Sequence, residues 1–115
     1  MKLPFALASR FVAAETLEET LPIVRELNEK GLRVALDRLG EYVDDRALAR
    51  EMNEIYKETL RTLADESARH NLDVDLSIKL SSIGQTVDRE LCRAQLFELL
   101  SIARTNDMFV TLDME

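Results

Sequence analysis

The chain has 115 residues, a formal net charge of −7 and one cysteine, Cys92. This length fits a single small domain, and 46% apolar with 32% charged residues is the composition of a folded chain. The negative charge argues against nucleic acid as a partner and gives no attraction to anionic lipid. A lone cysteine excludes an intrachain disulfide, favours a reducing compartment and is most simply a packing residue. His70 has no second ligand nearby in the sequence, so no metal site is predicted.

The first predicted element is a helix from Leu17 to Lys30. Thr16 and Glu19 have the spacing of a capping box, and Gly31 stands where a left-handed C-terminal cap belongs. Apolar residues recur every three or four positions along this segment, which predicts one buried face. Pro22 removes one backbone donor inside the helix.

The later elements continue an alternation of strands and helices. They are a strand at Arg33–Asp37, a helix at Arg46–His70 capped by Asp44 or Asp45, a strand at Val74–Leu80, a loop with Ser81, Ser82 and Gly84, a helix at Arg89–Arg104 capped by Asp88, and a strand at Met108–Met114. Such an alternation predicts right-handed crossovers and a parallel sheet. Because the last strand has no following helix to cover it, the pattern predicts part of a larger sheet.

Each predicted strand has one apolar face and one face with polar side chains. Ser77 and Lys79 share the polar face of the second strand, and Thr111, Asp113 and Glu115 share that of the third. An open doubly wound sheet has two apolar faces, whereas a barrel with a site at its mouth accommodates polar residues inside. The sequence therefore predicts an α/β chain that forms the first three strands of an incomplete (βα)8 barrel, with residues 1–115 as one partial domain.

Charged residues gather late in these strands, where barrels of parallel strands build their active sites. They are Asp37, Glu41, Lys79, Asp113 and Glu115. One lysine among carboxylates there has the chemistry to anchor an anionic substrate. Simpler interpretations remain open: Lys79 extends to solvent at the sheet end, Asp113 caps or pairs with Lys79, and Asp37 stabilises the turn that follows it.

Four blocks of the chain resemble successive blocks of the bacterial proline dehydrogenases. They are Arg-Phe-Val-Ala-Ala-Glu-Thr at 10–16, Leu-Asp-Arg-Leu-Gly-Glu at 36–41, Ser-Ile-Lys-Leu-Ser at 77–81 and Thr-Leu-Asp-Met-Glu at 111–115. Order and spacing both fit, and the resemblance covers nearly the whole chain. Ala14 stands where glycine is commoner in the family.

The resemblance implies a distorted (βα)8 barrel that holds FAD noncovalently, oxidises L-proline to pyrroline-5-carboxylate and passes electrons to a membrane quinone. By the same resemblance, Lys79 binds the proline carboxylate and Asp113 is the active-site aspartate beside it. Met114 would lie next to the flavin, and Glu41 would pair with a distant arginine to close the site. The expected location is the cytoplasm. The full-length protein is alternatively expected to lie at the inner face of the membrane as a peripheral protein.

Family members are longer, and their later strands and final helix carry most flavin contacts and a pair of substrate-binding arginines. The resemblance therefore implies that this chain alone is inactive. An alternative is a non-enzymatic module that associates through the open edge of its sheet, since an unpaired strand edge is a ready site for another chain. The sequence leaves the oligomeric state open.

Overall fold

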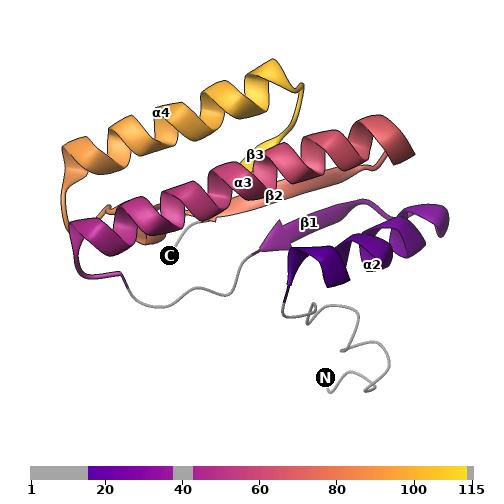
Figure 1. Ribbon diagram of the computed structural model, residues 1–115, viewed down its shortest axis with the longest axis horizontal. Helices are drawn as coiled ribbons and strands as arrows, with labels where there is room; N and C mark the ends of the chain where they lie inside the picture. The colour runs from indigo at the N-terminus through magenta and orange to yellow at the C-terminus, as the bar shows by residue number, and fades with distance from the viewer. Residues whose placement is uncertain (1–15, 38–42, 114–115) are drawn as a thin grey trace.

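The computed structural model describes residues 16–37 and 43–113 and contains the alternation of helices and strands expected from the sequence (Figure 1). Its elements are α2 (Leu17–Glu29), β1 (Val34–Asp37), α3 (Arg46–His70), β2 (Val74–Lys79), the 3-10 helix η1 (Leu80–Ile83), α4 (Arg89–Thr105) and β3 (Val110–Asp113). The strands form one parallel sheet in the order β1-β2-β3. The predicted α/β fold class is confirmed.

Side-chain caps set where the helices begin. Asp45, and not Asp44, caps α3, because its carboxylate accepts a hydrogen bond of 2.7 Å from the backbone N–H of Leu48. Asp88 caps α4 in the same way. The Thr16 hydroxyl accepts from the third residue of α2, as the capping box predicts. Each cap satisfies a backbone donor that the helix itself leaves unpaired.

The outer strands β1 and β3 pair with different parts of the central strand β2. β1 pairs with the start of β2, from Val34 opposite Val74 to the end of β1 opposite Ser77. β3 pairs with the last four residues of β2, so that Lys79 lies opposite Asp113. The β2–β3 pairing thus extends two residues further along β2 than the β1–β2 pairing, toward the carboxyl end.

All three helices cover one face of the sheet. α3 and α4 lie side by side over β2 and β3, while α2 lies beside β1 (Figure 1). The apolar residues of β2 (Val74, Leu76 and Ile78) are buried beneath them. The intervening residues of β2, on the opposite face, are partly exposed. Only the apolar face therefore has a protein partner among the described residues, as the polar strand pattern predicted.

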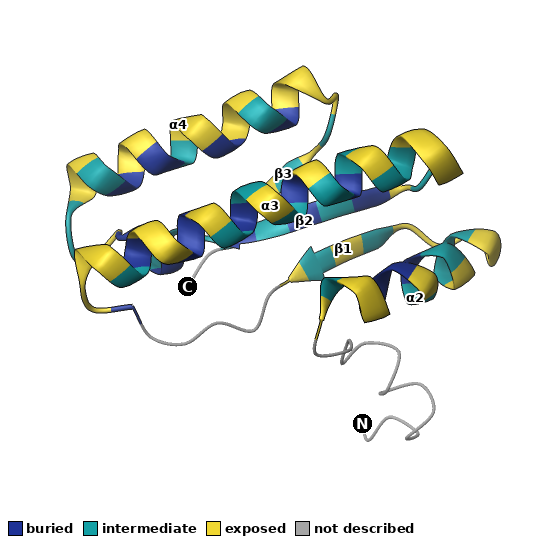
Figure 2. Ribbon diagram, in the orientation of Figure 1, coloured by how far each residue is buried: buried dark blue, intermediate teal, exposed yellow. Residues whose placement is uncertain are grey.

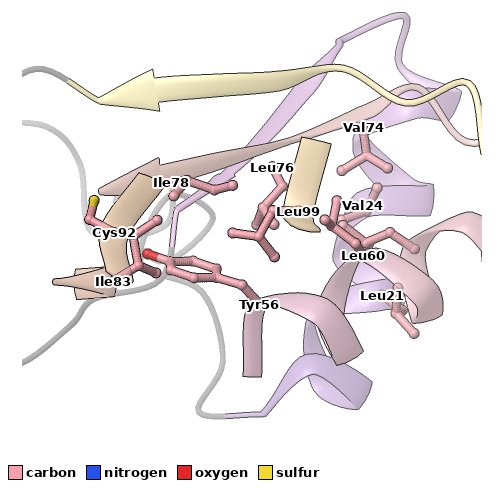
Figure 3. Packing of buried hydrophobic residues seen from close by; sticks show 11 residues of the cluster. Leu21, Val24, Tyr56, Leu60, Val74, Leu76, Ile78, Ile83, Cys92 and Leu99 are labelled. Atoms are coloured by element: carbon pink, nitrogen blue, oxygen red, sulfur yellow. The ribbon is translucent and has the colours of Figure 1, made fainter. Parts of the chain in front are cut away.

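The core is built from side chains that recur once per helical turn (Figure 2). Its main cluster comprises Leu21, Val24, Tyr56, Leu60, Leu63, Val74, Leu76, Ile78, Ile83, Cys92 and Leu99 (Figure 3). The buried face of α3 is rotated slightly from the one that its aliphatic residues suggest. Leu48 and Ile55 are only partly buried, whereas Asn53 and Tyr56 are almost completely buried.

Gln95 joins three elements in the interior. Its side chain is 4% exposed, and its Nε2 donates to the carbonyl oxygens of Ala49 in α3 (3.2 Å) and Ile83 in η1 (2.9 Å). A buried amide with two satisfied donor protons ties α4 to both neighbours.

No helix in the described ranges is long and apolar enough to cross a membrane.

Several boundaries differ from the sequence-based expectation by one residue, and two regions differ more. The predicted loop after the second strand forms η1 over Leu80–Ile83 and ends at Gly84, whose φ of +110° favours glycine. The third strand begins at Val110 and not at Met108. The N–H of Met108 donates to the Ala103 carbonyl at the end of α4, so this residue still belongs to the helix terminus.

Candidate active site

The polar face of the sheet brings Lys79 and Asp113 together at the carboxyl end of two neighbouring strands. Lys79 is the last residue of β2 and Asp113 the last of β3, and they are direct partners in the register. Side chains opposite each other in adjacent strands point to the same face, about 5 Å apart. Both residues are partly exposed. A cation and an anion thus lie side by side on the face that no helix of residues 16–37 and 43–113 covers.

The two groups are not bound to each other. Within residues 16–37 and 43–113, Lys79 and Asp113 form no ion pair with one another or with any other residue. The charged pairs in this part of the chain lie instead on the outer helices and at the far end of the sheet. Among the described residues, neither side chain is therefore neutralised by an ion pair.

The backbone holds Lys79 at a change of direction. Lys79 is still extended, with φ −95° and ψ 121°, and the next residue begins η1. Its N–H donates to the Tyr56 hydroxyl at an N···O distance of 3.4 Å. The carbonyl of Leu80 accepts from the Gln85 N–H (3.1 Å) and, more weakly, from the Cys92 thiol (3.7 Å). Protein groups thus fix the chain on both sides of Lys79.

Cys92 is part of this support and not of the chemistry. It is 7% exposed, and burial raises the pKa of its thiol, so the thiol stays protonated at neutral pH. Its predicted role as a packing residue is confirmed by its place in the main core cluster. His70 is exposed at the end of α3 beside Glu66.

The remaining predicted site residues lie apart from this pair or outside the described part. Asp37 is exposed at the end of β1 and lies opposite Ser77, one pleat behind Lys79 on the same face. Glu41 and Met114 fall in segments 38–42 and 114–115, outside the described residues, so their roles stay predictions. Tyr56 is the contact that sequence reasoning missed. Its three- and four-residue spacing from the neighbouring buried positions of α3 was the available signal.

A family model described as proline dehydrogenase matches residues 20–115. The chain belongs to the proline dehydrogenase family. The two residues paired at the strand ends, Lys79 and Asp113, both lie within the matched range. The resemblance on which the sequence analysis rested is thereby confirmed.

Curated proline dehydrogenases are similar over nearly the whole chain. Proline dehydrogenase 1 of Bacillus subtilis strain 168 is 39% identical over 108 residues, which are 94% of this chain and 34% of the relative. Proline dehydrogenase of Deinococcus radiodurans is 32% identical over 95% of this chain and 35% of its own length. The chain thus spans about one third of the length of these relatives.

A solved structure agrees at the level of the fold. Proline utilization A (PutA) from Bdellovibrio bacteriovorus superposes with a TM-score of 0.81 at 18% sequence identity. The superposition covers 95% of this chain and 14% of PutA. The open three-stranded sheet and its helices therefore have the same fold as part of the PutA structure.

Proposed function

We propose that this chain supplies part of the substrate site of a flavin-dependent proline dehydrogenase, which oxidises L-proline to pyrroline-5-carboxylate. The observation that carries the proposal is the adjacency of Lys79 and Asp113 at the carboxyl ends of β2 and β3, in a chain of this family. Ends of parallel barrel strands are where such enzymes assemble their chemistry.

The charges of this pair match those of L-proline. The amino acid is a zwitterion with a carboxylate and a ring ammonium on the same carbon atom. Lys79 would donate to the substrate carboxylate through a charge-assisted hydrogen bond. Asp113, one strand away, would accept from the ring nitrogen. The ring ammonium would first give one proton to solvent. The nitrogen lone pair would then form the C=N bond as hydride leaves the neighbouring ring carbon, and a carboxylate held there would stabilise the positive charge of the protonated imine.

The chain's own residues orient the substrate, and a bound flavin would supply the two-electron acceptor. The polar face, which no helix of the described part covers, is the side on which the strand-end residues would hold the flavin. FAD as the flavin, Met114 beside it, Glu41 as the closing carboxylate, a quinone as final acceptor and a cytoplasmic location all belong to the proposal and rest on the family resemblance.

The proposal is tested by replacing Lys79 with Met in the full-length enzyme that contains this segment. Loss of a charged hydrogen-bond partner is worth roughly 1.5–3 kcal/mol, so KM for proline should rise about 10- to 100-fold. Asp113→Asn should lower kcat more than it raises KM, because its carboxylate acts on charge that develops during the reaction.

Lys30→Met is the matched control. Lys30 is an exposed lysine at the C-terminal cap of α2, where it pairs with Glu26, and it lies well before the two strand ends in the sequence. It should leave both kinetic constants unchanged. Flavin absorbance per protein should be the same in all variants. An unchanged KM in Lys79→Met would contradict the role given to Lys79.

A second candidate function is association through the edge of β3. Phe109 and Leu112 are 72% and 40% exposed, and β3 is an edge strand in the described sheet. Exposed apolar residues along a strand edge are a ready surface for another chain. A monodisperse dimer of the 115-residue chain that dissociates on Leu112→Lys would support this function.

A further inference from the structure

Tyr56 brings a buried hydroxyl to the end of β2. Its side chain is 1% exposed, and among the described residues it leads the fully buried side chains by volume. Its ring belongs to the main core cluster with Ile78 and Ile83, and Figure 3 shows its oxygen pointing toward Ile83. This hydroxyl accepts the hydrogen bond from the Lys79 N–H described above. A core residue of α3 thus contacts the backbone of the candidate substrate-binding lysine.

The Lys79 N–H lacks an ordinary sheet partner in the described residues. Backbone N–H groups of a strand point alternately to its two neighbours. The Leu76 N–H donates to Phe109 on the β3 side, so the N–H of Lys79, three residues later, points to the β1 side. The described part of the pairing between β1 and β2 runs to Ser77, two residues earlier. Among the described residues, the acceptor of the Lys79 N–H is the Tyr56 hydroxyl.

This bond matters because Lys79 stands where the chain leaves β2 and enters η1. The next residue, Leu80, already begins η1, and its carbonyl is held by the N–H groups of Gly84 and Gln85. The Tyr56 hydroxyl is the bond on the other side of the same turn. Loss of this bond would loosen the end of β2 on the side away from β3, and with it the direction of the Lys79 side chain.

We infer that Tyr56 is a positioning residue for Lys79: its hydroxyl keeps the last residue of β2 extended, so that the ammonium group stays on the polar face beside Asp113. The inference rests on the proposed function, because it assigns Tyr56 a role only through substrate binding by Lys79. Tyr56 itself touches no substrate, being enclosed in the core.

The test is Tyr56→Phe in the full-length enzyme that carries this segment, since this change removes the hydroxyl and keeps the ring. KM for proline should rise about 2- to 10-fold, the range expected from loss of one net hydrogen bond, with kcat nearly unchanged. Hydrogen exchange in the peptide that spans residues 77–81 should accelerate. Flavin absorbance per protein and the melting temperature should stay close to those of the parent.

Thr59→Val is the matched control. It removes a hydroxyl from the same helix, but the Thr59 hydroxyl donates to the Ile55 carbonyl inside α3. It should leave KM and the exchange of residues 77–81 unchanged. Lys79→Met, measured in parallel, separates a failure of the positioning role of Tyr56 from a failure of the proposed function.

The inference is supported if Tyr56→Phe raises KM and accelerates hydrogen exchange while Thr59→Val does neither. Parent-like values in Tyr56→Phe, with a raised KM in Lys79→Met, overturn the positioning role and leave the proposed function standing. Loss of flavin or a much lower melting temperature in Tyr56→Phe also overturns it, because the residue would then act on the whole core. No effect of Lys79→Met removes the proposed function and the inference together.

Discussion

Asp88 illustrates how one carboxylate serves two neighbours. It caps α4 and also contacts Arg46 at the start of α3, with an N···O distance of 3.0 Å. The N–H of Leu91, and then the charge of Arg46, hold the pKa of the Asp88 carboxyl below its ordinary value of 3.8, against an opposing effect of desolvation. Asp88 thus links the starts of α3 and α4 through its charged form.

This arrangement predicts a stability change with pH at Asp88. Since the folded pKa is lowered, the stabilisation is present above the ordinary pKa and is lost as the pH falls through the folded value. Asp88→Ala should therefore lower the melting temperature at pH 7, and the deficit should shrink in acid. Asp88→Asn keeps a capping side chain, so its melting temperature at neutral pH should lie between those of the parent and of Asp88→Ala. Thermal melting at pH 7 and pH 3 checks this; an equal deficit for alanine at both pH values would contradict it.

Single residues also mark the limits of sequence reasoning. Lys79 and Asp113 could be placed at strand ends from alternation alone, because side-chain period and strand polarity fix which residues share a face. Their direct adjacency required the register, which alternation does not give. Tyr56 and Asn53 were not among the expected buried residues of this helix, yet the structure buries both.

Among the elements, the contact of α4 with α3 and η1 depends on an amide in an apolar setting. Gln95→Glu would place a carboxylate oxygen against the carbonyls of Ala49 and Ile83 in place of a donor. The free energy of unfolding should fall by about 2–4 kcal/mol, because two bonds are lost and a buried charge is created. The loss should diminish as the pH is lowered and the new carboxyl becomes protonated.

Gln85→Glu is the control for Gln95→Glu. Gln85 is exposed, and the bond recorded for it is made by its backbone. Denaturant unfolding at pH 7 and pH 5 should show little change in this variant. A Gln95→Glu protein as stable as the control at pH 7 would show that the buried amide is not needed to join the three elements.

Helix positions were predictable to within a residue or two because their signals are local. Asp88 and Gly31 act within one turn of the helix end that they define. η1 was not predicted, since four residues are too few to show a period, and Leu80–Ile83 reads equally well as a loop. Its formation depends on Gly84 adopting a left-handed backbone and on tertiary contacts with α3 and α4.

For the whole molecule, the fold class followed from the order of elements, and the match to the family supports the barrel interpretation. One face of the sheet is uncovered in the described part, and Leu112 is 40% exposed beside the buried Ile78. A sheet with one polar face and a partly bare apolar edge is a poor binding site for a large cofactor by itself. This chain spans about one third of the length of its curated relatives, and we propose that most of what would enclose a flavin lies outside this third.

The 115-residue chain by itself should therefore show no flavin absorbance after purification and no proline-dependent dye reduction. The physical reason is that a substrate site formed from one sheet face lacks the opposite walls that exclude water and orient ligands. An absorbance spectrum and a dye-reduction assay on the purified chain are sufficient, with the full-length enzyme as positive control. Robust turnover by the isolated chain would contradict the proposal that the site is shared with further strands.

The alternation of side chains along β3 has a consequence for changes in chain length. Side chains alternate with period two, so inserting one residue before Thr111 would turn Asp113 toward the helices and carry Leu112 onto the polar face. Inserting two residues would shift the strand end but restore every side chain to its original face. At the level of the gene, this strand should accept insertions and deletions of six nucleotides far more readily than those of three, although both preserve the reading frame.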